Sequence, residues 1–274
     1  MDLVFDIGST EITLGLFNGD EIRHHWRVAS DPRRTPDEFS VLLRQLLGAQ
    51  HVSSDGIDRA TLASVMPPVA VAVAVACETV LHLEGVMIDA RHPLPVRLDV
   101  DEPDRVGADR IVNAVAAHRL YGRDTIVVDL GTATTYDCVT AEGVFIGGAI
   151  APGARIAAEQ LTARTAKLPR VPLARPEKVI GRRTESCLRS GIFYGAVDAV
   201  DGMVRRIREE WGRRDPRVVA TGGLSAIIAP HCRTVQHIEP FLTLRGILFA
   251  REHLDRYPGE TAPPPRPTID KPAP

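Results

Sequence analysis

Leu3-Val4-Phe5-Asp6-Ile7-Gly8-Ser9-Thr10 opens the chain, and Ile126-Val127-Val128-Asp129-Leu130-Gly131-Thr132-Ala133-Thr134-Thr135 repeats its design far downstream. Each stretch is an apolar run typical of a buried strand, followed by Asp-apolar-Gly and then by hydroxyl residues. A second apolar stretch and a turn follow each copy, at Asn18-Gly19-Asp20 and at Ala141-Glu142-Gly143. Both copies therefore predict a strand, a tight turn and a returning strand.

The predicted turns carry the chemistry that binds phosphate. Glycine lets the backbone approach an anion closely, and backbone N–H groups and hydroxyls supply donors. One copy alone would more often be an ordinary tight turn with a capping Asp. Two copies at the heads of similar hairpins favour a pair of turns that hold a nucleoside triphosphate from both sides. The candidates are Asp6, Ile7, Gly8, Ser9, Thr10, Glu11, Ile12 and Thr13 in the first turn and Gly131 and Thr132 in the second.

A third glycine-rich element supports nucleotide binding. Thr221, Gly222 and Gly223 follow the strand-like Val218-Val219-Ala220. Such a turn can pack flat against a nucleobase or a ribose, where a side chain would collide. By itself it fits an ordinary strand-to-helix turn equally well.

Composition sets the broad class of the protein. The 274 residues are 44% hydrophobic and 25% charged, with a net charge of −2, which is ordinary for a soluble globular protein. No overall field therefore favours nucleic acid. The basic cluster Arg205-Arg206-Ile207-Arg208, with Arg213-Arg214 beyond it, lies on an expected helix that also carries Glu209 and Glu210, which favours a solvated helix face.

The cysteines and the N-terminus indicate a compartment. The four cysteines are scattered without a CxxC pair, so a zinc site is not expected. The chain enters a strand almost at once, behind an acidic Asp2, which is unlike a signal peptide. The most apolar stretch, from Val65 to Val80, is too short and interrupted to span a bilayer. We expect a cytoplasmic protein that binds neither membrane nor nucleic acid.

The elements between the motifs alternate between helix and strand. Thr35-Pro36-Asp37-Glu38 predicts a capped helix start. Strands are expected at 59–65 and 86–89, and helices at 69–81, 104–117, 154–165, 184–208, 224–229 and 242–254. We therefore expect an α/β fold in which helices cover mixed sheets. The Pro-rich tail from residue 258 to residue 274 is expected to be disordered.

These pieces, in this order, resemble the acetate-kinase/sugar-kinase/heat-shock/actin superfamily. Within it, nearly all of residues 1 to 257 is similar to type III pantothenate kinases. The motifs that carry the resemblance are the two Asp-apolar-Gly turns, Gly107-Ala108-Asp109-Arg110, Gly147-Gly148-Ala149-Ile150-Ala151-Pro152-Gly153, Gly181-Arg182-Arg183-Thr184 and Thr221-Gly222-Gly223. The resemblance implies duplicated ribonuclease-H-like (actin-like ATPase) domains, at 1–117 and 118–257.

The resemblance also implies a reaction. Pantothenate kinases use ATP to phosphorylate the primary hydroxyl of pantothenate, the first step toward coenzyme A. Asp109 matches the family's proton acceptor, whereas its position beside Arg110 also fits a simple ion pair or helix cap. Gly107, Ala108, Arg110 and Thr184 match pantothenate-binding positions, and Thr132 matches a nucleotide-binding one. For Thr132 and Thr184, the ordinary alternatives are a turn hydroxyl and a helix N-cap.

Cations and assembly follow from the same resemblance. Asp129 matches the position where the family binds a monovalent cation, K⁺ or NH₄⁺, and Asp6 would act at the phosphates through hydrated Mg²⁺. The apolar, small-sided helix from Thr184 to Arg208 is expected to be deep core or a subunit interface. Family members are homodimers whose pantothenate pocket lies at the junction.

Two positions depart from the family pattern. Ser9 stands where Asn is usual, and Val100 stands where an aromatic residue usually lines the pantothenate pocket. Two other functions stay open at this point. One is a nucleotide-binding accessory or regulatory protein with little turnover, and the other is a kinase of the same superfamily that acts on a sugar or a short acid.

Overall fold

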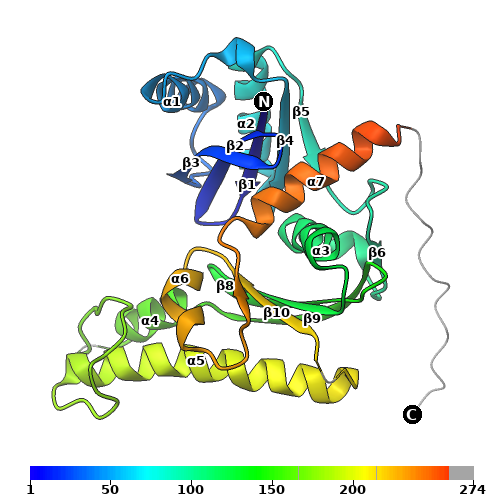
Figure 1. Ribbon diagram of the computed structural model, residues 1–274. Coiled ribbons are helices and arrows are strands. Elements are labelled where there is room, and N and C mark those ends of the chain that lie inside the picture. Colours follow the sequence, from blue (N-terminus) through cyan, green and yellow to red (C-terminus); the bar gives the residue numbers. More distant parts are fainter. Residues whose placement is uncertain (166, 214, 259–274) are drawn as a thin grey trace. The chain divides into compact units, whose positions relative to one another are not determined.

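The computed structural model describes residues 1–165, 167–213 and 215–258. The chain forms two compact units (Figure 1). Unit 1 comprises Met1–Arg119, Gly143–Phe145 and the chain from Thr243 onward, and unit 2 comprises Leu120–Glu142 and Ile146–Leu242. The expected fold class is confirmed, because both units are built on mixed sheets flanked by helices.

Unit 1 is built on a five-stranded mixed sheet in the order β3-β2-β1-β4-β5. The predicted first hairpin is β1 (Asp2–Ile7) with β2 (Glu11–Asn18), which β3 (Glu21–Ala29) extends on the outer side. On the other side, β4 (Arg59–Ser64) pairs parallel to β1, and β5 (Gly85–Ile88) pairs parallel to β4.

Two helices pack on one face of this sheet. Helix α1 (Pro36–Ala49) begins at the predicted cap, where the Thr35 hydroxyl accepts the Glu38 N–H and the Glu38 carboxylate accepts the Thr35 N–H. Helix α2 (Pro67–Leu81) follows β4, and a short 3₁₀ turn, η1 (Ser54–Gly56), precedes that strand. Apolar side chains of both helices and of the sheet form the core of unit 1.

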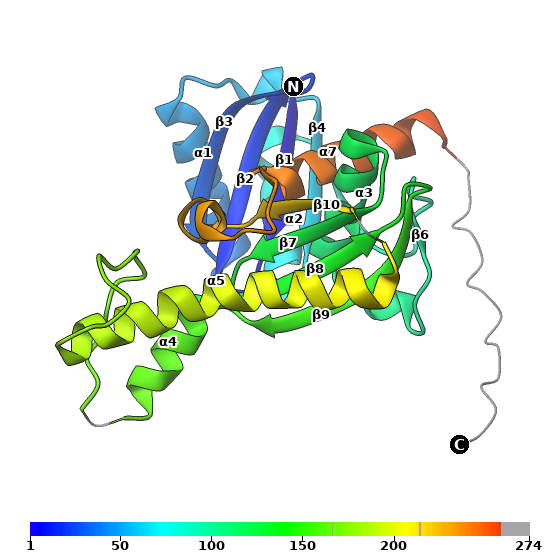
Figure 2. The same cartoon turned by 60° about the horizontal axis from the view of Figure 1, so that its bottom comes forward.

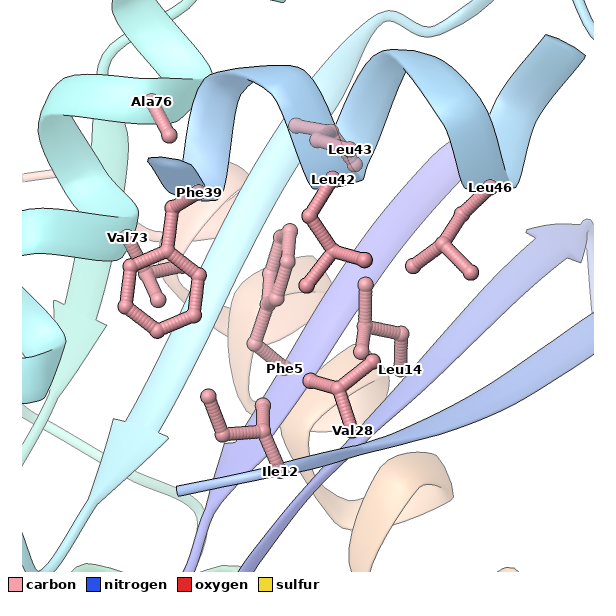
Figure 3. Close-up of a pocket in the computed structure, with 10 residues that line it drawn as sticks. All are labelled: Phe5, Ile12, Leu14, Val28, Phe39, Leu42, Leu43, Leu46, Val73 and Ala76. Atoms are coloured by element: carbon pink, nitrogen blue, oxygen red, sulfur yellow. The ribbon is translucent and has the colours of Figure 1, made fainter. Parts of the chain in front are cut away.

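The core of unit 1 contains a small void, shown in Figure 3. Its volume is about 20 Å³, and its lining is apolar, with Phe5 and Leu14 from the sheet and Phe39 and Val73 from the helices among its residues. A space of this size holds about one water molecule, and an apolar lining offers that water no partner. The void is therefore a packing defect and not a ligand site.

Two further helices belong to unit 1. After the 3₁₀ turn η2 (Pro103–Arg105), α3 (Ala108–Tyr121) begins later than the expected residue 104. Helix α7 (Leu242–Arg256), which we expected in the second half, groups with unit 1 from Thr243 onward. The reason is close packing: a Cβ on Gly246 would lie 1.9 Å from the Val112 carbonyl oxygen, and the Thr243 hydroxyl donates to Asn113 Oδ1 at 2.9 Å.

Unit 2 holds most of a six-stranded sheet in the order β11-β10-β7-β8-β9-β6. The predicted second hairpin is β7 (Thr125–Leu130) with β8 (Ala133–Val139), and β9 (Val144–Pro152) follows. Strand β10 (Arg217–Thr221) pairs parallel to β7, and β11 (His237–Ile238) pairs parallel to β10. The two-residue β6 (Arg97–Leu98) pairs with the start of β9.

Helices cover one face of the unit 2 sheet (Figure 2). They are α4 (Ala154–Ala163), α5 (Thr184–Trp211) and α6 (Ser225–Ile228), which runs into the 3₁₀ turn η3 (Ala229–His231). Phe193, Val197, Val200 and Val204 of α5 pack into a core with strands β7, β8 and β10. One face of α5 therefore belongs to the core, which is one of the two possibilities, core or subunit interface, that the sequence left open for this helix.

Some elements differ from the sequence expectations. Strands β3, β6 and β11 were not expected, and most of the helices begin or end a few residues from their predicted bounds. The expected disordered tail lies, from residue 259 on, outside the described residues. Within the described ranges, none of the helices combines the length and the apolar character needed to cross a bilayer.

Candidate nucleotide and substrate sites

The first predicted phosphate turn joins β1 to β2 in unit 1. The Gly8 N–H donates to the Glu11 carbonyl at 3.0 Å, and a Cβ on Gly8 would already touch that oxygen. Ser9, Thr10 and Glu11 are exposed at the tip. The Ser30 N–H donates to the Thr10 carbonyl at 2.9 Å, so the end of β3 braces the turn. The tip therefore presents two hydroxyls to solvent on a fixed backbone.

The side chains around this turn divide between the two faces of the sheet. Ile7 and Ile12 are fully buried in the core with α1 and α2, so only their backbone can face a ligand. Asp6 lies opposite Thr13 in the β1–β2 register, and both are half-buried on the other face. Of the predicted nucleotide-binding residues in this stretch, the side chains available for contact are those of Asp6, Ser9, Thr10, Glu11 and Thr13.

Strand β3 is an element that sequence reasoning missed. Its residues alternate between half-buried and exposed from Glu21 to Ala29. Ile22, His24, Trp26 and Val28 supply the period-two signal that could have found it. The strand places Arg27 directly opposite Thr13.

The Gly107–Arg110 motif forms the start of α3. The Arg110 N–H donates to Asp109 Oδ1 at 2.8 Å, and a Cβ on Gly107 would lie 2.5 Å from that same oxygen. A side chain at position 107 would therefore displace the Asp109 carboxylate. Gly107 also packs against Val65, whose N–H donates to the Ile7 carbonyl at 3.1 Å. The start of α3 therefore lies near the ends of the inner strands β1 and β4, where the first predicted phosphate turn begins.

The environment of Asp109 makes it more basic than an ordinary aspartate. Burial raises its pKa, and the backbone N–H and charge of Arg110 act in the opposite direction with a smaller effect. Desolvation penalises the charged form of a carboxylate. A carboxylate with a raised pKa accepts a proton more readily, which is the property that a general base needs.

Phe145 lies beneath the other predicted pantothenate contacts. The Arg110 guanidinium lies over the Phe145 ring, 5.2 Å from its centroid, and the Asp99 N–H donates to the Phe145 carbonyl at 2.8 Å. Val100, half-buried, follows Asp99 directly. Since Phe145 is fully buried, it orients Arg110 but cannot replace an aromatic wall at position 100. Ala108 is also buried and can offer only backbone.

The second phosphate turn joins β7 to β8 in unit 2. The Gly131 N–H donates to the Ala133 carbonyl at 3.0 Å, and the Gly153 N–H donates to the Thr132 carbonyl at 3.1 Å. A Cβ on Gly153 would lie 2.3 Å from that Thr132 oxygen. The last glycine of the motif 147–153 therefore packs flat against the turn and helps to fix it.

The third glycine element packs against the same turn. Gly222 has a φ of +88°, and a Cβ there would lie 2.3 Å from Asp129 Oδ1. The Leu224 N–H donates to the Leu130 carbonyl at 2.9 Å. Thr221 lies opposite Asp129 in the parallel β10–β7 register. Unit 2 thus gathers Asp129, the second turn and the Thr-Gly-Gly element into one cluster.

Thr221 contains a buried polar atom that no described residue satisfies. Its side chain is fully buried, and its hydroxyl finds no hydrogen-bond partner in the described part of the chain. Such an atom costs free energy unless a ligand, an ion or a water satisfies it. Among the described residues, no group of three or more His, Cys, Asp or Glu side chains forms a metal site.

Thr184 lies in another part of unit 2. It is the first residue of α5, and it is exposed. Arg183, not Thr184, stands at the cap position, and the Ser186 hydroxyl accepts the Arg183 N–H at 3.0 Å. Thr184 lines a cavity of about 550 Å³ between α4 and α5, together with Leu130, Tyr136 and apolar residues of both helices.

The comparison with protein families decides the classification. A family model described as type III pantothenate kinase matches residues 2–206. The chain belongs to this family. It is therefore a kinase, and ATP is the phosphoryl donor that the family implies.

Solved structures of the same fold support the classification at the level of architecture. A conserved Campylobacter jejuni protein assigned to the Baf family of transcriptional activators is 16% identical, with 93% of this chain and 100% of that chain covered and a TM-score of 0.56. The activator of 2-hydroxyisocaproyl-CoA dehydratase from Clostridium difficile, with bound ADPNP, is 12% identical over 95% and 99% of the two chains, with a TM-score of 0.54. A ROK hexokinase from Thermus thermophilus is 12% identical over 92% and 99%, with a TM-score of 0.50. At these identities the likeness shows the fold alone.

Proposed function

We propose that this kinase transfers the γ-phosphoryl group of ATP to the primary hydroxyl of pantothenate and releases ADP and 4'-phosphopantothenate. This reaction is the first step of coenzyme A biosynthesis. One observation carries the proposal beyond the family match. A half-buried carboxylate with a raised pKa, that of Asp109, stands at a helix start beside the ends of the inner strands β1 and β4, where the first proposed phosphate turn begins.

Asp109 is the proton acceptor in this proposal. The hydroxyl oxygen of pantothenate attacks the γ-phosphorus in line, and the bond from that phosphorus to the bridging oxygen of ADP breaks. The hydroxyl proton passes to the Asp109 carboxylate. The remaining work is positioning and neutralisation of charge, as in other phosphoryl transfers. The Arg110 N–H at 2.8 Å holds the carboxylate in place for this step.

Arg110 and Gly107 hold the carboxylate end of pantothenate. A guanidinium binds a carboxylate through two parallel hydrogen bonds when its plane is fixed. The Phe145 ring, 5.2 Å from the Arg110 guanidinium, stabilises the position of that group through a cation–π contact. Val100 and Thr184 complete the substrate contacts assigned from the family.

The three glycine elements bind the nucleotide. The Gly8–Thr10 tip and the Gly131–Thr132 turn supply backbone N–H groups and hydroxyls to the phosphates. Gly223 is exposed, and within the described residues a Cβ there would meet no atom inside 4 Å. That open backbone is suited to lie flat against the adenosine.

The cations assigned to the site fit the residues that are present. Asp129 and the unsatisfied Thr221 hydroxyl are hard oxygen donors in register on neighbouring strands, and oxygen donors suit K⁺ or NH₄⁺. Such a cation would offset the repulsion between the Asp129 carboxylate and the phosphates. The Asp6 carboxylate, at the end of β1, would hold a hydrated Mg²⁺ on the phosphates.

The cavity between α4 and α5 supports a homodimer as the active form. Gly191, Gly195 and Ala199 are exposed along the side of α5 that lines it. Ile180 nearby is 83% exposed. Exposed apolar surface of this kind is usually covered by a partner. The exposed side of α5 therefore fits the second possibility raised by the sequence, a subunit interface. Thr184 lies at its edge, which would bring a substrate contact to the junction.

The direct test is product formation. Purified protein with ATP, Mg²⁺ and K⁺ should release ADP on addition of pantothenate and form a phosphomonoester of matching mass, whereas sugars and acetate should give none. Release with a sugar or acetate and not with pantothenate would contradict the substrate. Nucleotide binding without turnover of any of them would favour the accessory or regulatory alternative.

A further inference from the structure

We propose that Arg27 of β3 contacts the terminal phosphates of the bound nucleotide. This inference deepens the proposed function, since it rests on ATP binding at the first phosphate turn. It identifies a phosphate-binding side chain outside the sequence motifs that define the family resemblance.

The register of the sheet in unit 1 places Arg27 on the ligand-facing row. Asp6 pairs with Thr13 across β1 and β2, and Thr13 pairs with Arg27 across β2 and β3. The one irregularity of this pairing lies farther along, between Leu16 and Phe17. Residues directly opposite on neighbouring strands share a face. Arg27, Thr13 and Asp6 therefore form a row on one face, with Arg27 roughly 10 Å from Asp6 at two strand spacings.

The other face of β3 is anchored in the core. Trp26 and Val28 pack against the core of unit 1, and Trp26 stacks on His24 with ring centroids 5.8 Å apart. Because side chains alternate along a strand, this anchorage directs Arg27 to the opposite face. The strand end is also tied to the turn, since the Ser30 N–H donates to the Thr10 carbonyl.

The charge of Arg27 is available for a ligand. Neighbouring arginines are engaged: Arg23 pairs with Glu21 at 3.1 Å, Arg33 pairs with Asp31 at 2.9 Å, and Arg34 lies over the Phe39 ring. The Arg27 side chain is exposed and makes no hydrogen bond, ion pair or ring contact with any described residue.

The chemistry of the turn calls for such a cation. Asp6 and Glu11 are acidic, whereas the stretch from Asp6 to Thr13 contains neither Lys nor Arg. A nucleoside triphosphate adds several negative charges there. A guanidinium two strands away, on the same face and with a long side chain, can reach the phosphate end of the nucleotide and not its base. Bidentate arginine–phosphate contacts are among the stronger hydrogen bonds in proteins.

The test compares nucleotides that differ in their phosphates. Binding of ATP, ADP and AMP is measured by calorimetry, without pantothenate, for Arg27→Gln, Arg27→Lys and the control Arg23→Gln, which lies on the same strand at the irregularity between Leu16 and Phe17. We expect Arg27→Gln to weaken ATP binding about 10- to 100-fold, to weaken ADP binding less, and to leave AMP binding unchanged. Arg27→Lys should recover part of the loss, and Arg23→Gln should bind ATP like the natural chain.

Two results would overturn the assignment. One is ATP affinity in Arg27→Gln equal to that of the natural chain. The other is an equal loss for AMP and ATP, which would indicate a structural role. Melting temperatures identify a misfolded variant, in which case the Arg27→Lys series decides. Since pantothenate is absent, the result stands apart from the substrate: a chain that binds ATP through Arg27 but does not phosphorylate pantothenate would contradict only the proposed function.

Discussion

The burial of Asp109 destabilises its charged form and makes its carboxylate a better proton acceptor. Its burial disfavours the charged carboxylate, which raises the pKa of the side chain. Gly107 leaves the space that the carboxylate occupies. Sequence patterning alone left a cap or an ion pair as alternatives for Asp109. Burial could not be read from the motif, because it comes from the packing of the start of α3 against Val65 and the sheet edge.

Asp109→Asn should lower kcat without weakening ATP binding. The amide keeps the shape of the side chain but cannot accept the hydroxyl proton, so we expect kcat to fall about 10²- to 10⁴-fold. Steady-state kinetics and nucleotide calorimetry measure the two effects. Turnover within about threefold of the natural chain would exclude Asp109 as the base.

The same variant should be at least as stable as the natural chain at neutral pH. A raised pKa in the folded state means that Asp109 costs stability as the pH rises through its folded pKa. Asn carries no charge, so its melting temperature should equal or exceed that of the natural chain at pH 7. The difference should vanish below about pH 4, where the carboxyl is protonated in both states. A lower melting temperature at pH 7 would contradict the desolvation account.

Val100→Tyr should lower the KM for pantothenate. Val100 is half-buried beside the Asp99–Phe145 contact, and a ring there would restore a large apolar contact worth about 1–3 kcal/mol. KM should then fall by roughly 5- to 150-fold, with kcat little changed, because the ring binds ground state and transition state alike. Loss of all activity in a folded variant would show that position 100 is packed core.

At the scale of elements, the repeated Asp-apolar-Gly stretch predicted both hairpins and their turns. Hydrophobic periodicity and a capping box likewise predicted α1, and helices were also expected where α2 and α5 lie. Strand β3 was missed because its alternation is carried by half-buried His24 and Trp26 and not by a plainly apolar run. The grouping of α7 with unit 1 depends on the close approach of Gly246 to Val112. These residues are far apart in the sequence, so no local pattern could predict their contact.

Alanine substitutions at Gly222 and Gly223 should have different effects, the first on the stability of the fold and the second on ATP affinity. Ala at position 222 has to adopt a φ of +88° with its Cβ 2.3 Å from Asp129 Oδ1, so Gly222→Ala should cost at least about 2 kcal/mol. The melting temperature should fall by roughly 4 °C or more. Gly223→Ala meets open space among the described residues and should melt like the natural chain while ATP affinity falls. The reverse pattern would refute this packing of the turn.

The turn at Asp129 should make the reaction depend on the monovalent cation. Because the Asp129 carboxylate and the Thr221 hydroxyl lie in register, activity in K⁺ or NH₄⁺ should be well above activity in Na⁺ at equal ionic strength. Asp129→Asn should remove the preference. Equal rates of the natural chain in all three salts would contradict the cation site.

At the scale of the molecule, each unit carries one of the two Asp-apolar-Gly hairpins that the repeated sequence predicted. The two units differ in what they add. Unit 1 adds Asp109, Arg110 and the Arg27 row, whereas unit 2 adds Asp129, the Thr221–Gly223 element and the cavity along α5. The proposed general base and the apolar surface between α4 and α5 therefore belong to different units, so variants can test the proposed dimer without changing Asp109.

Gly195→Arg should dissociate the proposed dimer into monomers. Gly195 is exposed on the side of α5 that lines the 550 Å³ cavity, and a Cβ there meets no described atom within 4 Å. The substitution therefore fits the folded chain but puts a charged side chain into the apolar surface. Light scattering at micromolar protein should give a dimer for the natural chain and a monomer for the variant. Gly202→Arg is the control, because Gly202 lies on the same helix outside the cavity lining.

Since Thr184 lies at the edge of this surface, the monomer should show a raised KM for pantothenate with ATP affinity unchanged. A natural chain that is monomeric and fully active would refute both the interface and the placement of the substrate pocket beside it.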